Sequence, residues 1–183
     1  MKELSLNILD IAKNSVKAGA TLIGIRLEET DDTLTLTITD NGCGMKEEIL
    51  RGVIDPFYTT RTTRKVGMGI PLLKLACEQT GGCVTITSRH ESEYPDTHGT
   101  EVTALFYKNH IDFTPIGDIV STVTTLLQGS PEIDWEFTHI SKVIHVTMDT
   151  REMRQVLGDD VPLNEPSVLS WIGEYLNDQY KNI

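Results

Sequence analysis

The stretch Asp40-Asn41-Gly42-Cys43-Gly44-Met45 constrains the fold of this chain more than any other part of its sequence. It directly follows residues 34–39, in which apolar and polar side chains alternate as in a half-buried strand. Two glycines one residue apart let the backbone turn without steric cost or lie close to a flat ligand. The carboxylate of Asp40 only accepts hydrogen bonds, so it suits a partner such as an exocyclic amine. Taken alone, the stretch also fits an ordinary turn, because Asn-Gly is a common turn dipeptide.

The hydrophobic pattern predicts helices and strands along the whole chain. Helices are expected over residues 3–18, 46–53, 70–80, 116–128, 150–157 and 166–180. Strands are expected over residues 20–28, 33–39, 83–89, 99–107, 132–139 and 142–148. A linker over residues 109–114 divides the chain into residues 1–108 and a small α+β module, residues 109–183. This module could fold alone, though only marginally at its size, or pack against the first segment.

Composition excludes several classes of protein. Residues 1–107 carry 11 Lys and Arg against 15 Asp and Glu, and residues 108–183 carry 5 against 12. Such an acidic chain lacks the basic face that binds nucleic-acid phosphates. Its apolar stretches are too short to span a membrane, and its N-terminus lacks the layout of a signal peptide. Three cysteines, without the paired spacing of zinc ligands, predict neither a disulfide framework nor a zinc site. We therefore expect a cytoplasmic protein without nucleic-acid or membrane partners.

A polar line runs along the first predicted helix. It consists of Glu3, Asn7, Asp10, Asn14 and Lys17, which are spaced three or four residues apart and so share one face. Asn and Asp form helices less readily than the Glu, Lys and Gln that usually cover an exposed face. This choice of residues favours a ligand-facing stripe, with a solvated helix face as the alternative.

A basic segment and a glycine-rich turn follow the second helix. Residues 55–65 have no hydrophobic period and hold Arg61, Arg64 and Lys65, the main concentration of positive charge in the sequence. Gly67-Met68-Gly69 then opens the helix expected over residues 70–80. The free N–H groups and the dipole at a helix N-terminus favour phosphate. The turn matches neither the P-loop nor the dinucleotide-binding fingerprint.

Together these segments resemble the ATP-binding domain of sensor histidine kinases, gyrase-type topoisomerases and mismatch-repair ATPases, known as the Bergerat fold. The matching segments, in the family's order, are residues 14–20 (asparagine box), 40–45 (first glycine box), 55–60 (phenylalanine box), 67–70 with Gly81-Gly82 (second glycine box) and Gly99-Thr100. The phenylalanine and second glycine boxes are most similar to those of sensor histidine kinases. The resemblance covers residues 3–107 and implies an α/β sandwich, in which helices cover a mixed sheet.

The resemblance implies a site for ATP, with Asp40 at its adenine end. Asp40 would bind the adenine amino group, and Thr100 would support it, directly or through water. Gly42 and Gly44 would let the backbone approach the base and the sugar.

The phosphate end implied by the resemblance is built from the first helix and the basic segment. Asn14 would ligate Mg²⁺ through its amide oxygen, a donor type that this ion prefers, and Lys17 would contact a phosphate as a point charge. Arg61, with Arg64 or Lys65, would lie in a short lid over residues 61–66 and neutralise the γ-phosphate. Gly67 and Gly69 would donate backbone N–H groups to the phosphates.

Asp10 departs from the family's pattern. It lies four residues before Asn14, on the same helix face. The hydrolysing branches of the family place a glutamate there as the general base that activates water. Aspartate is one methylene shorter, so it would reach that water only with a closer helix or through a second water. A catalytic role and a hydrogen-bonding role near Mg²⁺ both remain open.

The resemblance predicts an ATP·Mg-binding protein that acts as a regulatory ATPase or as a protein kinase on a separate partner. The family's kinases carry a phosphoacceptor histidine on a preceding helical pair, which this sequence does not show. The alternative is a non-catalytic module that binds ATP and recruits a protein partner. We expect residues 109–183 to contact that partner, and we expect the five histidines to be ordinary surface or strand residues.

Overall fold

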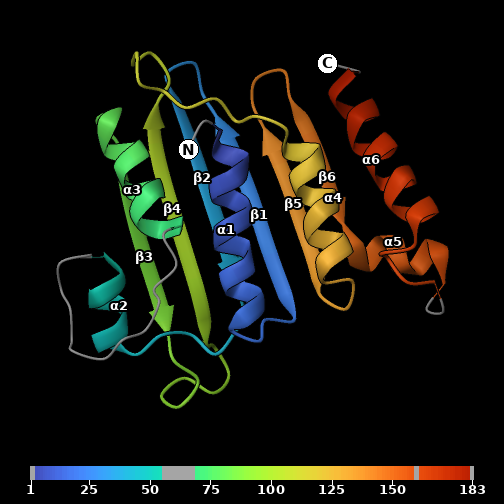
Figure 1. The fold of residues 1–183 in the computed structure, drawn as a ribbon, viewed down its shortest axis with the longest axis horizontal. Coiled ribbons are helices and arrows are strands. Elements are labelled where there is room, and N and C mark those ends of the chain that lie inside the picture. The colour runs from blue at the N-terminus through green and yellow to red at the C-terminus, as the bar shows by residue number, and fades with distance from the viewer. Residues whose placement is uncertain (1–2, 55–68, 159–160, 182–183) are drawn as a thin grey trace.

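The computed structural model describes residues 3–54, 69–158 and 161–181, which form one six-stranded mixed sheet with helices packed on it (Figure 1). The strands lie in the order β3-β4-β2-β1-β5-β6, and every neighbouring pair is antiparallel except β1 and β5. The strands are β1 (Leu22–Glu29), β2 (Thr33–Asp40), β3 (Cys83–Arg89), β4 (Gly99–Tyr107), β5 (Asp134–Ile140) and β6 (His145–Asp149). The helices are α1 (Leu4–Lys17), α2 (Glu47–Ile54), α3 (Gly69–Gln79), α4 (Ile119–Gly129), α5 (Thr150–Leu157) and α6 (Pro166–Lys181).

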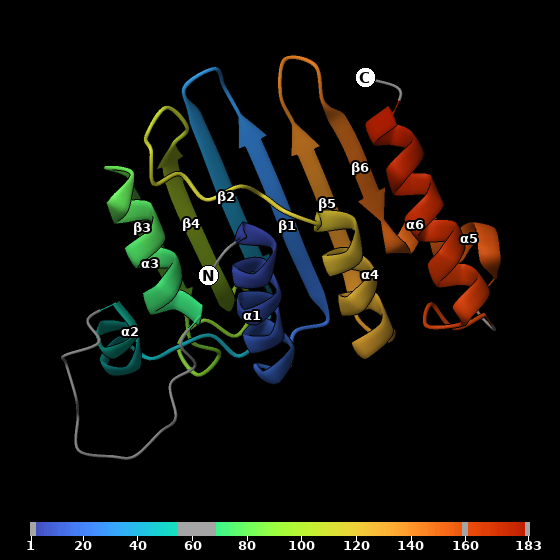
Figure 2. The ribbon, with the colours of Figure 1, turned by 45° about the horizontal axis from the view of Figure 1, so that its top comes forward.

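Helices α1, α3 and α4 lie across one face of the sheet, as the two ribbon views show (Figures 1 and 2). The alternation of the strands explains this arrangement, since Leu34, Leu36 and Ile38 of β2 are buried and the threonines between them are only partly covered. In α1, the apolar side chains of Leu4, Ile8 and Ile11 are buried against the sheet. The chain is thus of the α+β class, and the mixed, helix-covered sheet that the resemblance implies is confirmed. Among the described helices, none has both the length and the hydropathy that a membrane crossing requires.

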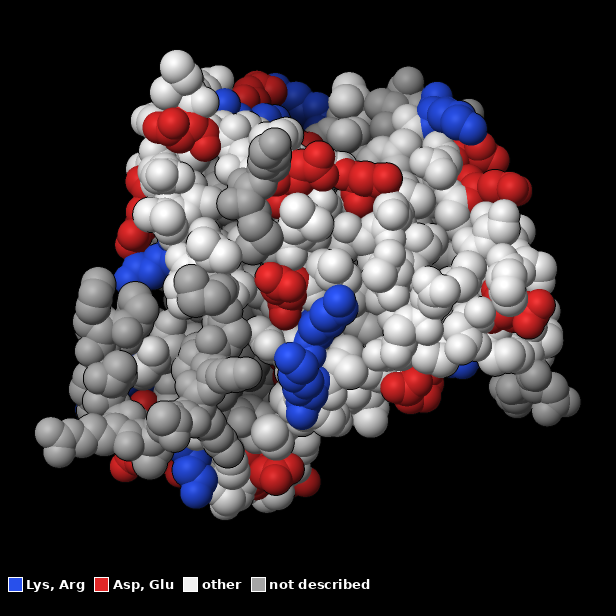
Figure 3. All heavy atoms as spheres, viewed as in Figure 1, with Lys and Arg blue, Asp and Glu red and all other residues white. Residues whose placement is uncertain are grey.

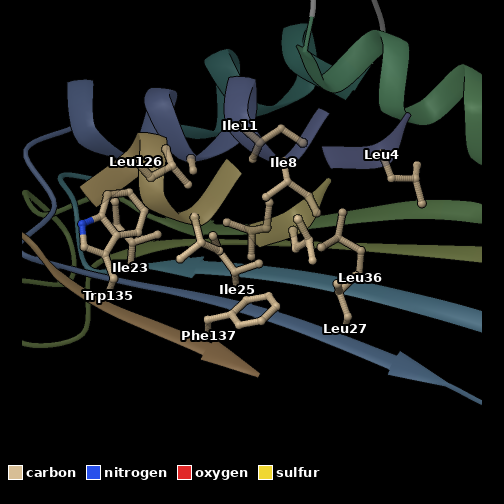
Figure 4. Close-up of a cluster of buried hydrophobic side chains, with 14 of the residues drawn as sticks. Leu4, Ile8, Ile11, Ile23, Ile25, Leu27, Leu36, Leu126, Trp135 and Phe137 are labelled. Carbon is tan, nitrogen blue, oxygen red and sulfur yellow. The ribbon is translucent and has the colours of Figure 1, made fainter. Parts of the chain in front are cut away.

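Residues 109–183 extend the sheet of the first segment. Strand β5 pairs with β1 in parallel, from Leu22 opposite Asp134 to Glu28 opposite Ile140. Trp135 and Phe137 of β5 are fully buried in the same cluster as the side chains of α1 and β1 (Figure 4). The structure thus favours the alternative in which the C-terminal segment packs against the first one, with a shared core. That residues 109–183 can also fold alone stays a prediction.

The segment between β4 and α4 caps the start of α1. The backbone N–H groups of Leu4 and Ser5 donate to the carbonyl oxygens of Pro115 and Ile116, at 2.9 and 2.8 Å. These contacts satisfy donors that a helix N-terminus otherwise leaves free. Because Pro115 and Ile116 are engaged in this way, α4 begins at Ile119, three residues later than the sequence indicates. The side chain of Asp118 caps α4 by accepting a hydrogen bond from the N–H of Ser121 at 2.9 Å.

A polar cluster ties the last helix to the sheet. His139 of β5 is almost fully buried, and its Nε2 lies 2.8 Å from Glu29 Oε1 while its Nδ1 lies 2.8 Å from the hydroxyl of Tyr180 on α6. Lys108 Nζ lies 2.7 Å from the other carboxylate oxygen of Glu29. Burial opposes the ionisation of Glu29, but the hydrogen bonds from Lys108 and His139 outweigh it and hold the pKa of this carboxyl below its ordinary value.

Glu29→Gln is expected to make the free energy of unfolding depend less on pH in the acidic range. Because the folded-state pKa of Glu29 is lowered, its ionised form stabilises the folded chain above the ordinary carboxyl range. This contribution is lost as the pH falls through the folded-state pKa. Urea unfolding between about pH 7 and about pH 3 should show the variant less stable at the upper end, with the gap to wild type closing towards the lower end. A gap that stays constant over this range would contradict the prediction.

Candidate nucleotide-binding site

The carboxylate of Asp40 is held from two sides at the end of β2. Ser15 of α1 donates its hydroxyl to Asp40 Oδ2 at 2.6 Å, and the N–H of Gly42 donates to Asp40 Oδ1 at 2.9 Å. Each carboxylate oxygen can accept a second hydrogen bond. Asp40 is partly exposed, so it is oriented by the protein and can still accept from a ligand. We call residues 40–45 the clamp loop.

Asn41 has a structural role in the clamp loop. Its Oδ1 accepts from the N–H groups of Thr21 and Leu22 at 2.8 and 2.9 Å, and its Nδ2 donates to the hydroxyl of Thr21 at 2.9 Å. These bonds fasten the loop to the beginning of β1, which fixes the direction in which the chain leaves β2.

The two glycines of the clamp loop are required by close contacts. A Cβ atom at Gly42 would lie 2.9 Å from both Cβ and the carbonyl oxygen of Ala18. Gly44 has a φ of +68°, and a Cβ there would lie 1.9 Å from the carbonyl oxygen of Arg89. A side chain at either position would therefore displace the loop from α1 or from β3.

The opposite wall of the loop is the β3–β4 hairpin. Thr100 lies opposite Asp40 in the β2–β4 register, and its hydroxyl lies 2.9 Å from that of Ser88. Ser88 Oγ also accepts from the N–H of Met45 at 2.8 Å. The ring atom Nδ1 of His98 lies 2.6 Å from the carbonyl oxygen of Gly42. The structure thus brings Asp40, Gly42, Gly44 and Thr100 together, the grouping that the family resemblance implies.

Three side chains of this site are not predicted from the sequence. Ser15 lies on the buried face of α1. A hydroxyl on that face, next to Asn14, is the one sequence feature that could have indicated its role. Ser88 lies on a strand with no sequence mark of its role. His98 is more than the ordinary surface residue expected, since it contacts the clamp loop from a position 56 residues away along the chain.

The residues of the polar line of α1 differ in their exposure to solvent. Asp10 and Lys17 are exposed and Asn14 is partly exposed. Figure 3 shows a blue patch over the second half of α1, the helix that carries Lys13 and Lys17. Asn7, by contrast, is 1% exposed, and its Nδ2 has no hydrogen-bond partner among the residues that the structure describes. Asn7 therefore lies on the packed side of α1.

Asp10 lies against the first turn of α3. A Cβ atom at Gly69 would come within 3.1 Å of Asp10 Cβ, so the two backbones approach closely there. The N-terminus of α3 is thus directly beside the face of α1 that carries Asp10 and Asn14. Arg61, Arg64, Lys65, Gly67 and the phenylalanine box, residues 55–60, lie outside the described residues.

The donors near this helix pair suit a metal ion that is bound mainly through a nucleotide. Within the described part of the chain, no group of three or more His, Cys, Asp or Glu side chains could hold a metal ion by itself. Mg²⁺ usually takes one or two protein oxygens together with substrate phosphates and water. The amide oxygen of Asn14, partly exposed on α1, is a donor of this kind.

Comparison with known proteins places this site in a family. Residues 2–110 match the family described as histidine kinase-, DNA gyrase B- and HSP90-like ATPase. The chain belongs to this family. Members of it bind ATP, and the match contains α1, the clamp loop, α3 and both strands of the β3–β4 hairpin.

The sequence relatives include a sensor histidine kinase and a sporulation kinase. The tetrathionate sensor histidine kinase TtrS of Salmonella typhimurium is 33% identical over 54% of this chain and 16% of its own length. Sporulation kinase B of Bacillus subtilis is 27% identical over 55% of this chain and 23% of its own length. The chain thus spans less than a quarter of the length of these relatives.

Solved structures extend the likeness of the fold further along the chain. The N-terminal domain of a DNA repair protein superposes with a TM-score of 0.54 and 15% identity, over 87% of this chain and 58% of that chain. The MutL ATPase domain of Aquifex aeolicus, solved in complex with ADP, gives 0.52 and 13%, over 86% and 69%. The matched share of this chain is larger than residues 2–110 can supply, so it includes part of the segment that carries β5 and β6.

Proposed function

We propose that the chain binds ATP with Mg²⁺ between the clamp loop and α1. It hydrolyses this ATP slowly and thereby regulates a separate protein partner. The observation that supports this best is the orientation of Asp40 by Ser15 and Gly42, which leaves each carboxylate oxygen able to accept from an adenine amino group. Thr100 and Ser88 form the adjacent wall. Ser15 and Gly42 already hold the carboxylate of Asp40 in place, so little free energy is lost in ordering this side chain on binding.

The phosphate groups would lie along α1 towards α3. Asn14 would hold Mg²⁺ through its amide oxygen, and Lys17, one turn further on, would contact a phosphate. When bound, Mg²⁺ neutralises phosphate charge during attack by water. The backbone N–H of Gly69, in the first turn of α3, would donate to the same phosphates. Arg61 and Gly67 would complete the site from the segment before α3.

Asp10 would act as the general base. It is exposed beside the first turn of α3 and four residues before Asn14, which places a carboxylate next to the proposed phosphate site. A carboxylate there can accept the proton of an attacking water. A second candidate function, a protein kinase acting on a separate partner, is favoured by the likeness to sensor kinases. A module that binds ATP without turnover is the third possibility.

Phosphate release from ATP by Asp10 variants tests these roles. We expect Asp10→Asn to slow release by roughly 100-fold, the low end of what a general base contributes. Asp10→Glu, which restores the family's usual residue, should keep hydrolysis. Calorimetric titration with ATP and Mg²⁺ should show unchanged affinity for both variants.

Other outcomes separate the candidates. Equal turnover in Asp10→Asn and wild type would show that Asp10 is not the base. Absence of turnover in wild type, with ATP bound, would leave the non-catalytic module, and transfer of labelled phosphate to a co-purifying protein would identify the kinase.

A further inference from the structure

A groove lies at the C-terminal edge of the molecule, between α5, α6 and the two last strands of the sheet. Its volume is about 400 Å³, and its walls come from β5, β6, α5 and α6, all within residues 109–183. We call it the α5–α6 groove. The elements that line it lie at the end of the sheet opposite β3 and β4 (Figure 1).

Exposed apolar side chains gather in this groove. Trp171, Tyr175 and Val156 are 39%, 40% and 79% exposed, and Met148 and Met153 line the wall beneath them. Trp171 and Tyr175 are one helical turn apart on α6, with ring centroids 6.1 Å apart and an angle of 30° between the rings. Because the two rings stack, each limits the side-chain motion of the other. A partner that binds to their exposed faces therefore costs little side-chain entropy. Trp and Tyr are the residues that most often dominate the free energy of protein association.

Carboxylates surround these rings. Glu136, Asp149 and Glu152 line the groove. Arg151 pairs with Glu136 and, at 2.7 Å, with Asp149. Glu152 has no ion pair among the described residues, so the groove keeps a net negative charge. Its field suits a cationic ligand and repels a second copy of this chain, whose net charge is −11.

The edge strand beside the groove does not offer its backbone to a partner at Thr147. The side chain of Gln179 on α6 accepts from the N–H of Thr147 and donates to its carbonyl oxygen, both at 3.0 Å. Gln179 thus takes the place of a neighbouring strand and blocks strand addition at that point. A partner that reaches Thr147 must therefore be recognised there through side chains.

We propose that the α5–α6 groove binds a basic, partly apolar segment of the protein partner. An Arg or Lys of that segment stacks on Trp171 and Tyr175 and faces Glu152, while neighbouring apolar side chains cover Val156 and Met148. Guanidinium groups combine well with aromatic faces and carboxylates. This inference names the surface for the partner in the proposed function, and it does not depend on ATP binding.

The test uses the full chain and three synthetic peptides of leucine and alanine that differ only in carrying arginine, glutamate or glutamine. Calorimetry and tryptophan fluorescence, in which Trp171 is the exposed one of the two tryptophans, should report binding of the arginine peptide and neither of the others. Trp171→Ala should weaken binding by roughly 30-fold or more, the scale of an interface hot spot. Glu152→Gln should weaken it by about 3-fold, as expected for a partly exposed ion pair. Ile111→Ala, at a 95% exposed apolar residue outside the groove, is the matched control and should not change binding.

Several results would overturn the inference. They are failure of the arginine peptide to bind, equal binding of the glutamate peptide, or unchanged binding by Trp171→Ala. Binding of argininamide as tight as that of the peptide would reveal a small-cation pocket instead. Sedimentation that shows a dimer lost in Trp171→Ala would reveal self-association. Titration of Asp40→Asn without nucleotide separates the two proposals, because peptide binding should persist even where ATP binding is lost.

Discussion

Asp40→Asn is expected to weaken ATP binding by about 100-fold, because it removes the charge from the hydrogen-bonded carboxylate that we propose to bind the adenine amino group. The wild-type carboxylate accepts from Ser15 and from the N–H of Gly42, and keeps lone pairs for the ligand. An amide has one oxygen acceptor, and its nitrogen would face either the Ser15 hydroxyl or the adenine amino group as a second donor. Calorimetric titration with ATP and Mg²⁺ measures the effect.

Asp96→Asn is the matched control for this prediction. Asp96 is exposed in the loop between β3 and β4, so the same loss of one carboxylate should leave ATP affinity unchanged. The melting temperature of Asp40→Asn should fall only slightly, since one net hydrogen bond stabilises a protein by about 1 kcal/mol. Equal ATP affinity for Asp40→Asn and wild type would reject Asp40 as the adenine-binding group.

Gly44→Ala is expected to destabilise the protein by about 2–4 kcal/mol, the scale of a clash combined with backbone strain. Gly44 has a φ of +68°, which costs an alanine about 1 kcal/mol. The added methyl group would also lie 1.9 Å from the carbonyl oxygen of Arg89, a backbone atom at the end of β3. The loop can escape only by leaving the hairpin, so ATP affinity should fall with stability. Urea unfolding and calorimetry measure the two effects.

Gly129→Ala is the matched control for this prediction, because alanine fits at this position without a clash. Gly129 is the last residue of α4, its φ is not positive, and a Cβ there would have no atom within 4 Å. The same substitution should be neutral or stabilise the chain by up to about 1 kcal/mol, because alanine favours helix. If both glycine variants were equally stable, the tight contact of the clamp loop with β3 would be disproved.

Helix α1 joins the two parts of the chain. One of its faces carries Asp10, Asn14 and Lys17, and its first turn is held by the carbonyl oxygens of Pro115 and Ile116. Its buried side chains share a core with Trp135 of β5. The fold likeness to the MutL ATPase domain covers 86% of this chain, so it includes part of the sheet beyond residue 110.

The sequence alone determined the local elements and the family. Hydrophobic periodicity depends on neighbouring residues, so most helices and strands lie within two residues of their predicted ends. The exceptions are the starts of α4 and β6, each three residues late. For α4 the reason is tertiary, since Pro115 and Ile116 cap α1. The motifs around Asp40 and Asn14 likewise depend on short spacings that a sequence displays directly.

Only the tertiary structure decided which distant residues meet. The parallel pairing of β5 with β1 joins segments more than a hundred residues apart, and alternation within a strand does not specify its neighbour. The contacts of Ser15 with Asp40 and of His98 with Gly42 span 25 and 56 residues. Each is a single hydrogen bond whose partner is chosen by the packing of whole elements, and such packing leaves no periodic mark in the sequence.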